Sequence, residues 1–272
     1  LPVERLRRLR MQGGLALEHL TAMGAKLSNV ELQFSALDGE LSIEPATAEL
    51  YQGKYRGVAR LDARGDTPQL TLKSELARVA LEPLLEDLAG RRDLAGSVNF
   101  EARLTGSGAT PAALRSTLAG QATFALRDGV FRGVDVPAVV AAGGMLLAGK
   151  LPTRLPSGGE TAFKAFTGTL ELRDRVVTNQ DLQLDGEDFS VRGNGIVAKL
   201  DSATMDYEAR VTLGQDGAEI PLRCRGKIAG ASCLPDFKAL SQRKLAKPLG
   251  NALRKLKEEV KGKSVEPVRK AQ

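Results

Sequence analysis

The sequence predicts a mainly β protein, an antiparallel meander interrupted by a few short helices. Apolar and polar residues alternate with a period of two along most of the 272-residue chain, as in strands that bury one face. The turn signals between these runs favour meandering hairpins over βαβ crossovers. Asp-Gly, a dipeptide that suits two-residue hairpin turns, occurs beside alternating runs at Asp38-Gly39, Asp128-Gly129, Asp185-Gly186 and Asp216-Gly217.

Each strand is predicted from an alternating run that ends at turn residues. Leu41 and Ile43, and then Ala48 and Leu50, alternate with less apolar neighbours before Gly53 marks a turn. The predicted strands cover residues 10–20, 25–36, 40–50, 54–63, 69–77, 94–105, 119–127, 160–173, 175–184, 187–199, 203–214 and 218–228.

Helices are predicted at a few places between these strands. Residues 81–88 carry a proline early, and residues 111–118 follow Thr110, a residue type that caps helix starts. Two more are predicted, at 136–147 and from about Pro235 onwards. The phrases 94–100 and 118–124 are similar, and each follows a short helical stretch, so they look like two copies of a helix-then-strand unit.

The composition is that of a globular domain, with 42% hydrophobic and 26% charged residues. The longest nearly apolar stretch, residues 134–148, contains Asp135, Pro137 and a glycine pair, so no membrane span is predicted. The chain begins at Leu1 without a signal-like segment, and we expect it to be a trimmed part of a longer protein.

Positive charge is concentrated at the C-terminal end. Residues 234–272 hold 11 Lys and Arg against 4 Asp and Glu, a net +7, which leaves −1 of the chain's +6 for residues 1–233. We therefore predict a β domain over 1–233 and a basic amphipathic helical segment over 234–272. The segment either meets an anionic membrane surface or is a solvated helix or tail. Its candidates for a membrane surface are Arg243, Lys244, Lys247, Arg254, Lys255 and Lys257.

Several phrases, in their order along the chain, resemble the AsmA family of Gram-negative envelope proteins, specifically their C-terminal periplasmic part. They are residues 41–55, 84–88, 106–134, 166–172 and 191–197, with Tyr207, so the similarity runs from about residue 2 to 237. The resemblance implies a periplasmic protein with an upstream inner-membrane anchor and a role in outer-membrane biogenesis. It also implies a strongly twisted open groove or partial barrel, which larger relatives are proposed to use to conduct phospholipids.

Catalytic chemistry has little support in the sequence. His19 is the only imidazole, and we expect it on a surface or sheet edge. Gly106-Ser107-Gly108 lacks the third glycine of a dinucleotide fingerprint because Pro111 stands there. Carboxylate pairs such as Glu86-Asp87 are predicted to be solvating charges. We predict no enzyme, no catalytic, cofactor-binding or metal-binding residues, and no nucleic acid as partner.

Cys224 and Cys233 are nine residues apart, which is compatible with two strand ends of a hairpin. They are either two buried thiols or a disulfide. The compartment that the resemblance implies is oxidising, so we favour the disulfide.

The predicted activity is the binding or transfer of phospholipid along an apolar β groove. Aliphatic strand faces suit acyl chains, although the same residues also fill an ordinary core. The 136–147 helix is either a lid over the groove or one more core helix. As lipid contacts it offers Val136, Val139, Val140, Met145, Leu146 and Leu147. The alternative is a scaffold that binds other envelope or outer-membrane assembly proteins by β-augmentation.

Overall fold

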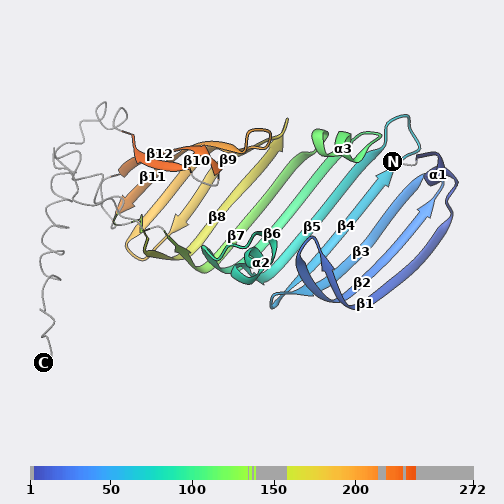
Figure 1. Cartoon of the computed structure of the whole chain (residues 1–272), viewed down its shortest axis with the longest axis horizontal. Helices are drawn as coiled ribbons and strands as arrows, with labels where there is room; N and C mark the ends of the chain where they lie inside the picture. Colours follow the sequence, from blue (N-terminus) through green and yellow to red (C-terminus); the bar gives the residue numbers. More distant parts are fainter. Residues whose placement is uncertain are drawn as a thin grey trace, which may run out of the picture.

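A single open antiparallel sheet forms the protein. The computed structural model describes residues 3–133, 135, 136, 138, 158–213, 219–228 and 231–236. Within them, 13 strands pair in chain order, so the predicted meander is confirmed. The first and last strands are not paired with each other, and the sheet is not a closed barrel. Figure 1 shows strands side by side along the long axis of the molecule. The elements are α1 (Val3–Arg8), β1 (Met11–Ala22), β2 (Ala25–Leu37), β3 (Glu40–Leu50), β4 (Gly53–Asp62), β5 (Gln69–Ala80), α2 (Leu81–Ala89), β6 (Leu94–Ser107), α3 (Pro111–Thr117), β7 (Ala119–Arg132), β8 (Glu160–Arg173), β9 (Val176–Asp185), β10 (Phe189–Lys199), β11 (Thr204–Leu213), β12 (Glu219–Lys227) and β13 (Ser232–Pro235).

Tight turns with left-handed backbone join several neighbouring strands. Asp38 and Gly39 have φ of 47° and 89°, as a two-residue hairpin turn requires. Tyr51 and Gln52 adopt the same region with φ of 44° and 67°, although neither residue type signals such a turn. At Asp185-Gly186 the predicted connection is present, and the Gly186 N–H donates to the Phe189 carbonyl at 2.8 Å. Asp216-Gly217 lies outside the described residues.

The predicted hairpin turn at Asp128-Gly129 is wrong, because both residues lie inside β7. Asp128 has φ of 49°, but the chain continues in the same direction and pairs with β8 on both sides of it. The register with β6 shifts opposite this point, between Ala95 and Ser97. A positive φ within a strand makes a bulge, which adds a residue and bends the strand without reversing it.

The sheet extends further than predicted at its C-terminal end. β13 was not predicted from the sequence; it pairs antiparallel with β12 and places Cys233 directly opposite Cys224. A disulfide joins these two residues, as predicted. Pro235 belongs to β13, so the helix predicted from about Pro235 does not begin there. The rest of that predicted helix lies outside the described residues.

Helices lie at the ends of the strands. α2 and α3 match the predictions within a residue or two, whereas α1 was missed because its six residues are too few for a periodic pattern. α2 precedes β6 and α3 precedes β7, which confirms the two helix-then-strand units. The two helices lie at opposite ends of the strands (Figure 1).

Thr110 caps α3 as predicted, because its side chain accepts a hydrogen bond from the Ala113 N–H at 3.1 Å. We expect Thr110→Ala to lower the free energy of unfolding by about 1 kcal/mol, the usual effect of a lost N-cap. Arg115→Ala on the same helix is the control and should change it by less than about 0.5 kcal/mol. Urea denaturation measures both, and equal losses would contradict the capping role.

Candidate functional site

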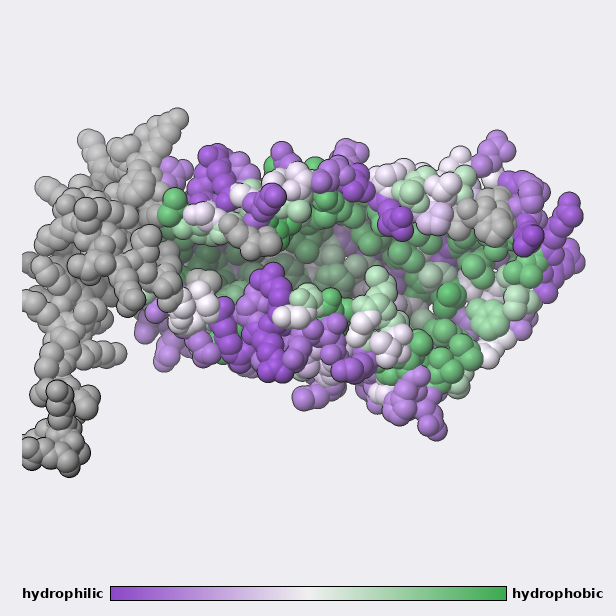
Figure 2. Space-filling model, viewed as in Figure 1, coloured by the Kyte–Doolittle hydropathy of each residue, from purple (hydrophilic) through white to green (hydrophobic). Residues whose placement is uncertain are grey.

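The two faces of the sheet differ in chemistry. On β5, the side chains of Leu70, Leu72 and Leu76 are half-buried on one face, while Thr71, Lys73 and Glu75 are exposed on the other. We call the first the inner face, because the helices and the core residues lie on it. Figure 2 shows it as an apolar hollow that runs along the molecule between two polar rims. The sequence prediction of a trough with an apolar lining is therefore confirmed, whereas what the trough binds stays a prediction.

One half of the trough is filled. Buried side chains from β5, β6, β7 and β8 meet Leu84 of α2 there. Four phenylalanine rings join them in edge or tilted contacts, with neighbouring centroids 5.0–6.0 Å apart. They are Phe124, Phe131, Phe163 and Phe166. This filled half provides the packing that holds α2 against the sheet.

The other half of the trough, at the opposite ends of the same strands, is lined by aliphatic side chains that are only half-buried. Register places them in continuous cross-strand rows, for example Leu61, Leu70 and Gly106, or Leu72, Leu104 and Gly120. None of these leucines packs against the core cluster among the described residues. We call the set the aliphatic lane: Ile43, Leu61, Leu72, Leu104, Leu170 and Leu172.

Glycines leave space for aromatic rings from the neighbouring strand. Gly168 is directly opposite Phe124, and an added Cβ would come within 3.0 Å of the Phe124 ring. Gly129 is opposite Phe163 with a corresponding distance of 2.2 Å. The glycine in each pair leaves room for its partner's ring close to the sheet, which allows these rings to pack in the filled half. The high glycine content, 29 residues, was the only sequence signal for these glycine–phenylalanine pairs, because the two partners of each pair are distant in sequence.

A buried polar cluster interrupts the apolar face where β8 meets β9. Asn179 is 1% exposed, and its amide nitrogen donates to the Thr169 carbonyl and to the Asp181 carboxylate, each at 2.8 Å. The Asn179 oxygen accepts from the Leu182 N–H at 3.1 Å and from the Tyr207 hydroxyl. Burial, and to a smaller extent the Asp181 charge, raises the pKa of the Tyr207 hydroxyl. The cluster satisfies its own polar groups, so it offers no reactive group, and it interrupts the apolar row that contains Leu170.

A second polar cluster fastens α2 to the sheet. Asp87 accepts hydrogen bonds from the Tyr51 hydroxyl at 2.6 Å and from the Lys26 ammonium at 3.0 Å. The Tyr51 oxygen also accepts from the Lys26 N–H at 3.0 Å. Asp87 was predicted to be a solvating charge, and this is wrong, because folding brings β2 and the β3–β4 turn to it. Its neighbour Glu86 is paired as well, with Arg92 at 2.7 Å.

The Asp87 contacts predict a pH dependence. The Tyr51 hydrogen bond, followed by that of Lys26, lowers the pKa of Asp87 below its ordinary value of about 3.9. The stabilisation is therefore fully present above about pH 4 and lost as the pH falls through the lowered pKa. We expect Asp87→Asn to unfold at a lower urea concentration than the wild type near neutral pH, with a gap that closes in acid. Glu75→Gln is the control and should show no such gap, while a gap that is independent of pH would contradict the mechanism.

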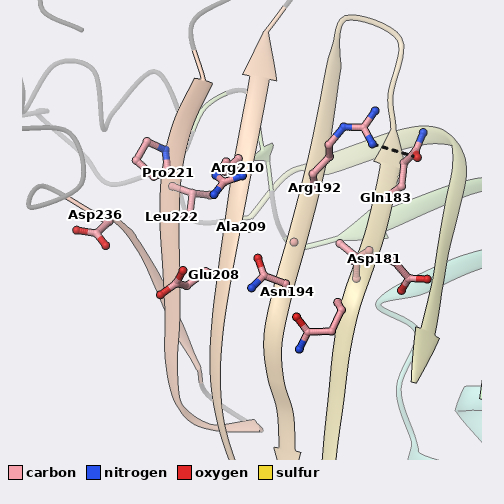
Figure 3. A pocket seen from close by; sticks show the side chains of 13 residues that line it. Asp181, Gln183, Arg192, Asn194, Glu208, Ala209, Arg210, Pro221, Leu222 and Asp236 are labelled. Atoms are coloured by element: carbon pink, nitrogen blue, oxygen red, sulfur yellow. Dashed lines mark hydrogen bonds between the residues drawn. The ribbon is translucent and has the colours of Figure 1, made fainter. Parts of the chain in front are cut away.

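The outer face carries a polar hollow of about 460 Å³ between β9 and β12 (Figure 3). Arg192 and Arg210 are directly opposite each other in it, beside Asn194 and Glu208. Arg192 donates to the Gln183 side chain at 3.4 Å. Charges of both signs line this open surface, and they do not converge on one point.

Candidate residues for catalysis are few in the described part of the chain. There, no group of three or more His, Cys, Asp or Glu side chains is placed to hold a metal ion. His19 is exposed on β1, the edge strand, as predicted. Of the helices that the structure describes, none is long and apolar enough to cross a bilayer.

The structure describes one of the six predicted lipid contacts. Val136 is half-buried against the core cluster, and its N–H donates to the Thr161 hydroxyl at 3.0 Å. The Asp135 carboxylate accepts from the Ala138 N–H at 2.9 Å, the contact that caps a helix start. Val139, Val140, Met145, Leu146 and Leu147 lie outside the described residues, as do the six basic candidates for a membrane surface: Arg243, Lys244, Lys247, Arg254, Lys255 and Lys257.

An open antiparallel meander with one apolar, concave face defines a β-trough protein. The sequence model of the AsmA family matches residues 2–182, so the chain belongs to the AsmA family. It is similar to Protein AsmA of Escherichia coli (strain K12), with 23% identity over 195 residues, which are 71% of this chain and 32% of that relative. The chain thus spans about a third of the relative's length. No solved structure matches it.

Proposed function

We propose that the protein binds phospholipid and conducts it along the apolar trough, as the periplasmic part of an envelope protein that acts in outer-membrane biogenesis. In this proposal an upstream segment anchors it in the inner membrane, and it works without catalysis. Membership of the AsmA family supports the envelope role. The Cys224–Cys233 disulfide supports an oxidising compartment, since such bonds persist there.

The chemistry of the trough carries the lipid proposal. The aliphatic lane presents methyl and methylene groups, and its six residues offer no side-chain donor or acceptor. A peptide in the lane would leave its backbone N–H and C=O groups without partners, at a cost of a few kcal/mol for each buried group. An acyl chain has no such groups and gains about 0.8 kcal/mol for each buried CH₂. The lane therefore suits hydrocarbon better than protein.

Lipid extraction and mass spectrometry of the purified chain test the proposal. We expect phospholipid to co-purify with the wild type, and to be lost from Leu104→Asp, which places a charge in the lane. Thr105→Asp is the matched control, because Thr105 is the next residue of β6 and is exposed on the outer face. Circular dichroism establishes that both variants fold. A reproducibly lipid-free wild type, or equal lipid in both variants, would refute the proposal.

The basic C-terminal segment has a proposed role in the same activity. Arg243, Lys244, Lys247, Arg254, Lys255 and Lys257 would hold one end of the trough near an anionic leaflet, each contributing about 1 kcal/mol at the surface. Replacing all six with glutamine should reduce flotation with anionic vesicles and leave flotation with neutral vesicles unchanged.

A second candidate function is a scaffold that adds a partner's strand to the sheet. The observation that favours it is the edge of β1, twelve residues long, without lysine or proline and with Met11 and Leu15 exposed by 45% and 44%. Ala16→Pro in β1 should abolish partner binding under this proposal and leave bound lipid unchanged.

A further inference from the structure

We propose that the acyl chain of a bound phospholipid lies only in the aliphatic lane, the half of the trough away from α2, and that the Asn179–Tyr207 cluster ends the row of the lane that contains Leu170. This inference rests on the proposed lipid-binding function. It names the part of the inner face that touches lipid, and it excludes residues that are equally apolar.

The filled half of the trough has no room for an acyl chain. Phe163 is 4% exposed and Leu84 of α2 is 8% exposed, so their surfaces already contact protein. The phenylalanine rings and α2 form one continuous packed layer there. A chain in this half would have to displace α2, which Asp87 fastens through Tyr51 and Lys26.

The lane, in contrast, is lined by half-buried side chains along six neighbouring strands, and α3 packs against its β6 end at Gly106. From Ile43 on β3 to Leu170 on β8, its side chains are half-buried, and small residues at Gly120 and Ala122 widen it on β7. Five strand spacings of about 4.8 Å give a length of about 24 Å. Because a bilayer's hydrocarbon core of about 30 Å holds two leaflets, one acyl chain needs about 15 Å. The lane is thus long enough for one chain to lie across the strands.

The Asn179–Tyr207 cluster marks the end of one row of the lane. Asn179 is the direct partner of Leu170 across β8 and β9, so this row meets a buried amide, whereas the row of Leu172 continues to Val177 on β9. Tyr207 lies beyond it, opposite Gly195 on β10. A hydrocarbon chain gains nothing from contact with hydrogen-bonded polar groups, whereas the leucines before them bury its methylenes.

Photo-crosslinking at matched positions tests the inference. A benzoylphenylalanine side chain is placed at Leu72 or Leu104 in the lane, and at Leu76 or Phe100 in the filled half. Each pair shares a strand and a face, four residues apart. The full chain is expressed in bacteria, irradiated and analysed for phospholipid adducts by mass spectrometry. We expect about tenfold more adduct at the lane positions, which corresponds to a preference of about 1.4 kcal/mol.

The outcomes separate this inference from the proposed function. Equal adduct at lane and filled-half positions would overturn the lane and leave lipid binding intact. Absence of adduct at all four positions, with lipid-free protein, would refute the proposed function itself.

A pair of substitutions on β7 tests the inference without the bulky label. Ala122→Phe should reduce bound phospholipid several-fold by filling the lane, while Phe124→Leu on the same strand should leave the amount of bound phospholipid unchanged. Reduction by Phe124→Leu alone would also overturn the lane.

Discussion

Leu126→Ala is expected to lower the free energy of unfolding by about 3 kcal/mol, because Leu126 is 2% exposed and its truncation leaves a cavity in the filled half of the trough. Val98 on β6 and Phe166 on β8 lie directly opposite it, and both belong to the packed layer under α2. Backbone pairing on both sides restricts the collapse of the cavity. Urea denaturation followed by circular dichroism measures the loss.

Leu72→Ala is the matched control, since it makes the same truncation in the aliphatic lane. Leu72 is half-buried and outside the core cluster, so we expect it to cost less than half as much as Leu126→Ala. Equal costs would show that the lane is packed like a core, which would contradict the division of the trough into two halves.

Asn179→Ala is the second change with a large expected effect, a loss of about 3 kcal/mol. It leaves the Leu182 N–H and the Tyr207 hydroxyl without their shared acceptor, and the Thr169 carbonyl without its side-chain donor. Each buried polar group left without a partner costs about 1–3 kcal/mol. Thermal and urea unfolding both report the change.

Tyr207→Phe removes only one hydrogen bond of this cluster and keeps the ring beside Gly193 of β10. Asn179 retains the Leu182 N–H as donor, so we expect a loss of about 1 kcal/mol. The double variant should lose less than the sum, because the two side chains share one hydrogen bond. A larger effect of Tyr207→Phe than of Asn179→Ala would contradict the central place of the amide.

Most strands could be predicted because their information is local. Alternation with a period of two reports which face of a strand is buried, and Leu70 to Leu76 on β5 show it without help from other segments. Thr110 caps α3 through a contact three residues away, so it was also predictable. Asp128-Gly129 misled the prediction, because a positive φ suits both a turn and a bulge, and only the pairing partner decides between them.

The site was predicted only in outline. An apolar inner face follows from the alternation, but the difference between a filled half and an open half depends on where α2 docks. Asp87 meets Tyr51 and Lys26 across separations of 36 and 61 residues, and no pattern near Asp87 signals them. The positions of Gly168 opposite Phe124 and of Gly129 opposite Phe163 could not be predicted either, because the register of the sheet sets cross-strand partners.

The amino-acid sequence by itself determined the antiparallel meander and its apolar and polar faces, because period-two patterning and turn chemistry act between near neighbours. Tertiary structure alone decided that the inner face divides into a packed half and an aliphatic lane, and that Asn179 and Tyr207 interrupt it. These features arise from contacts between residues tens of positions apart, whose geometry follows from the curvature and register of the whole sheet.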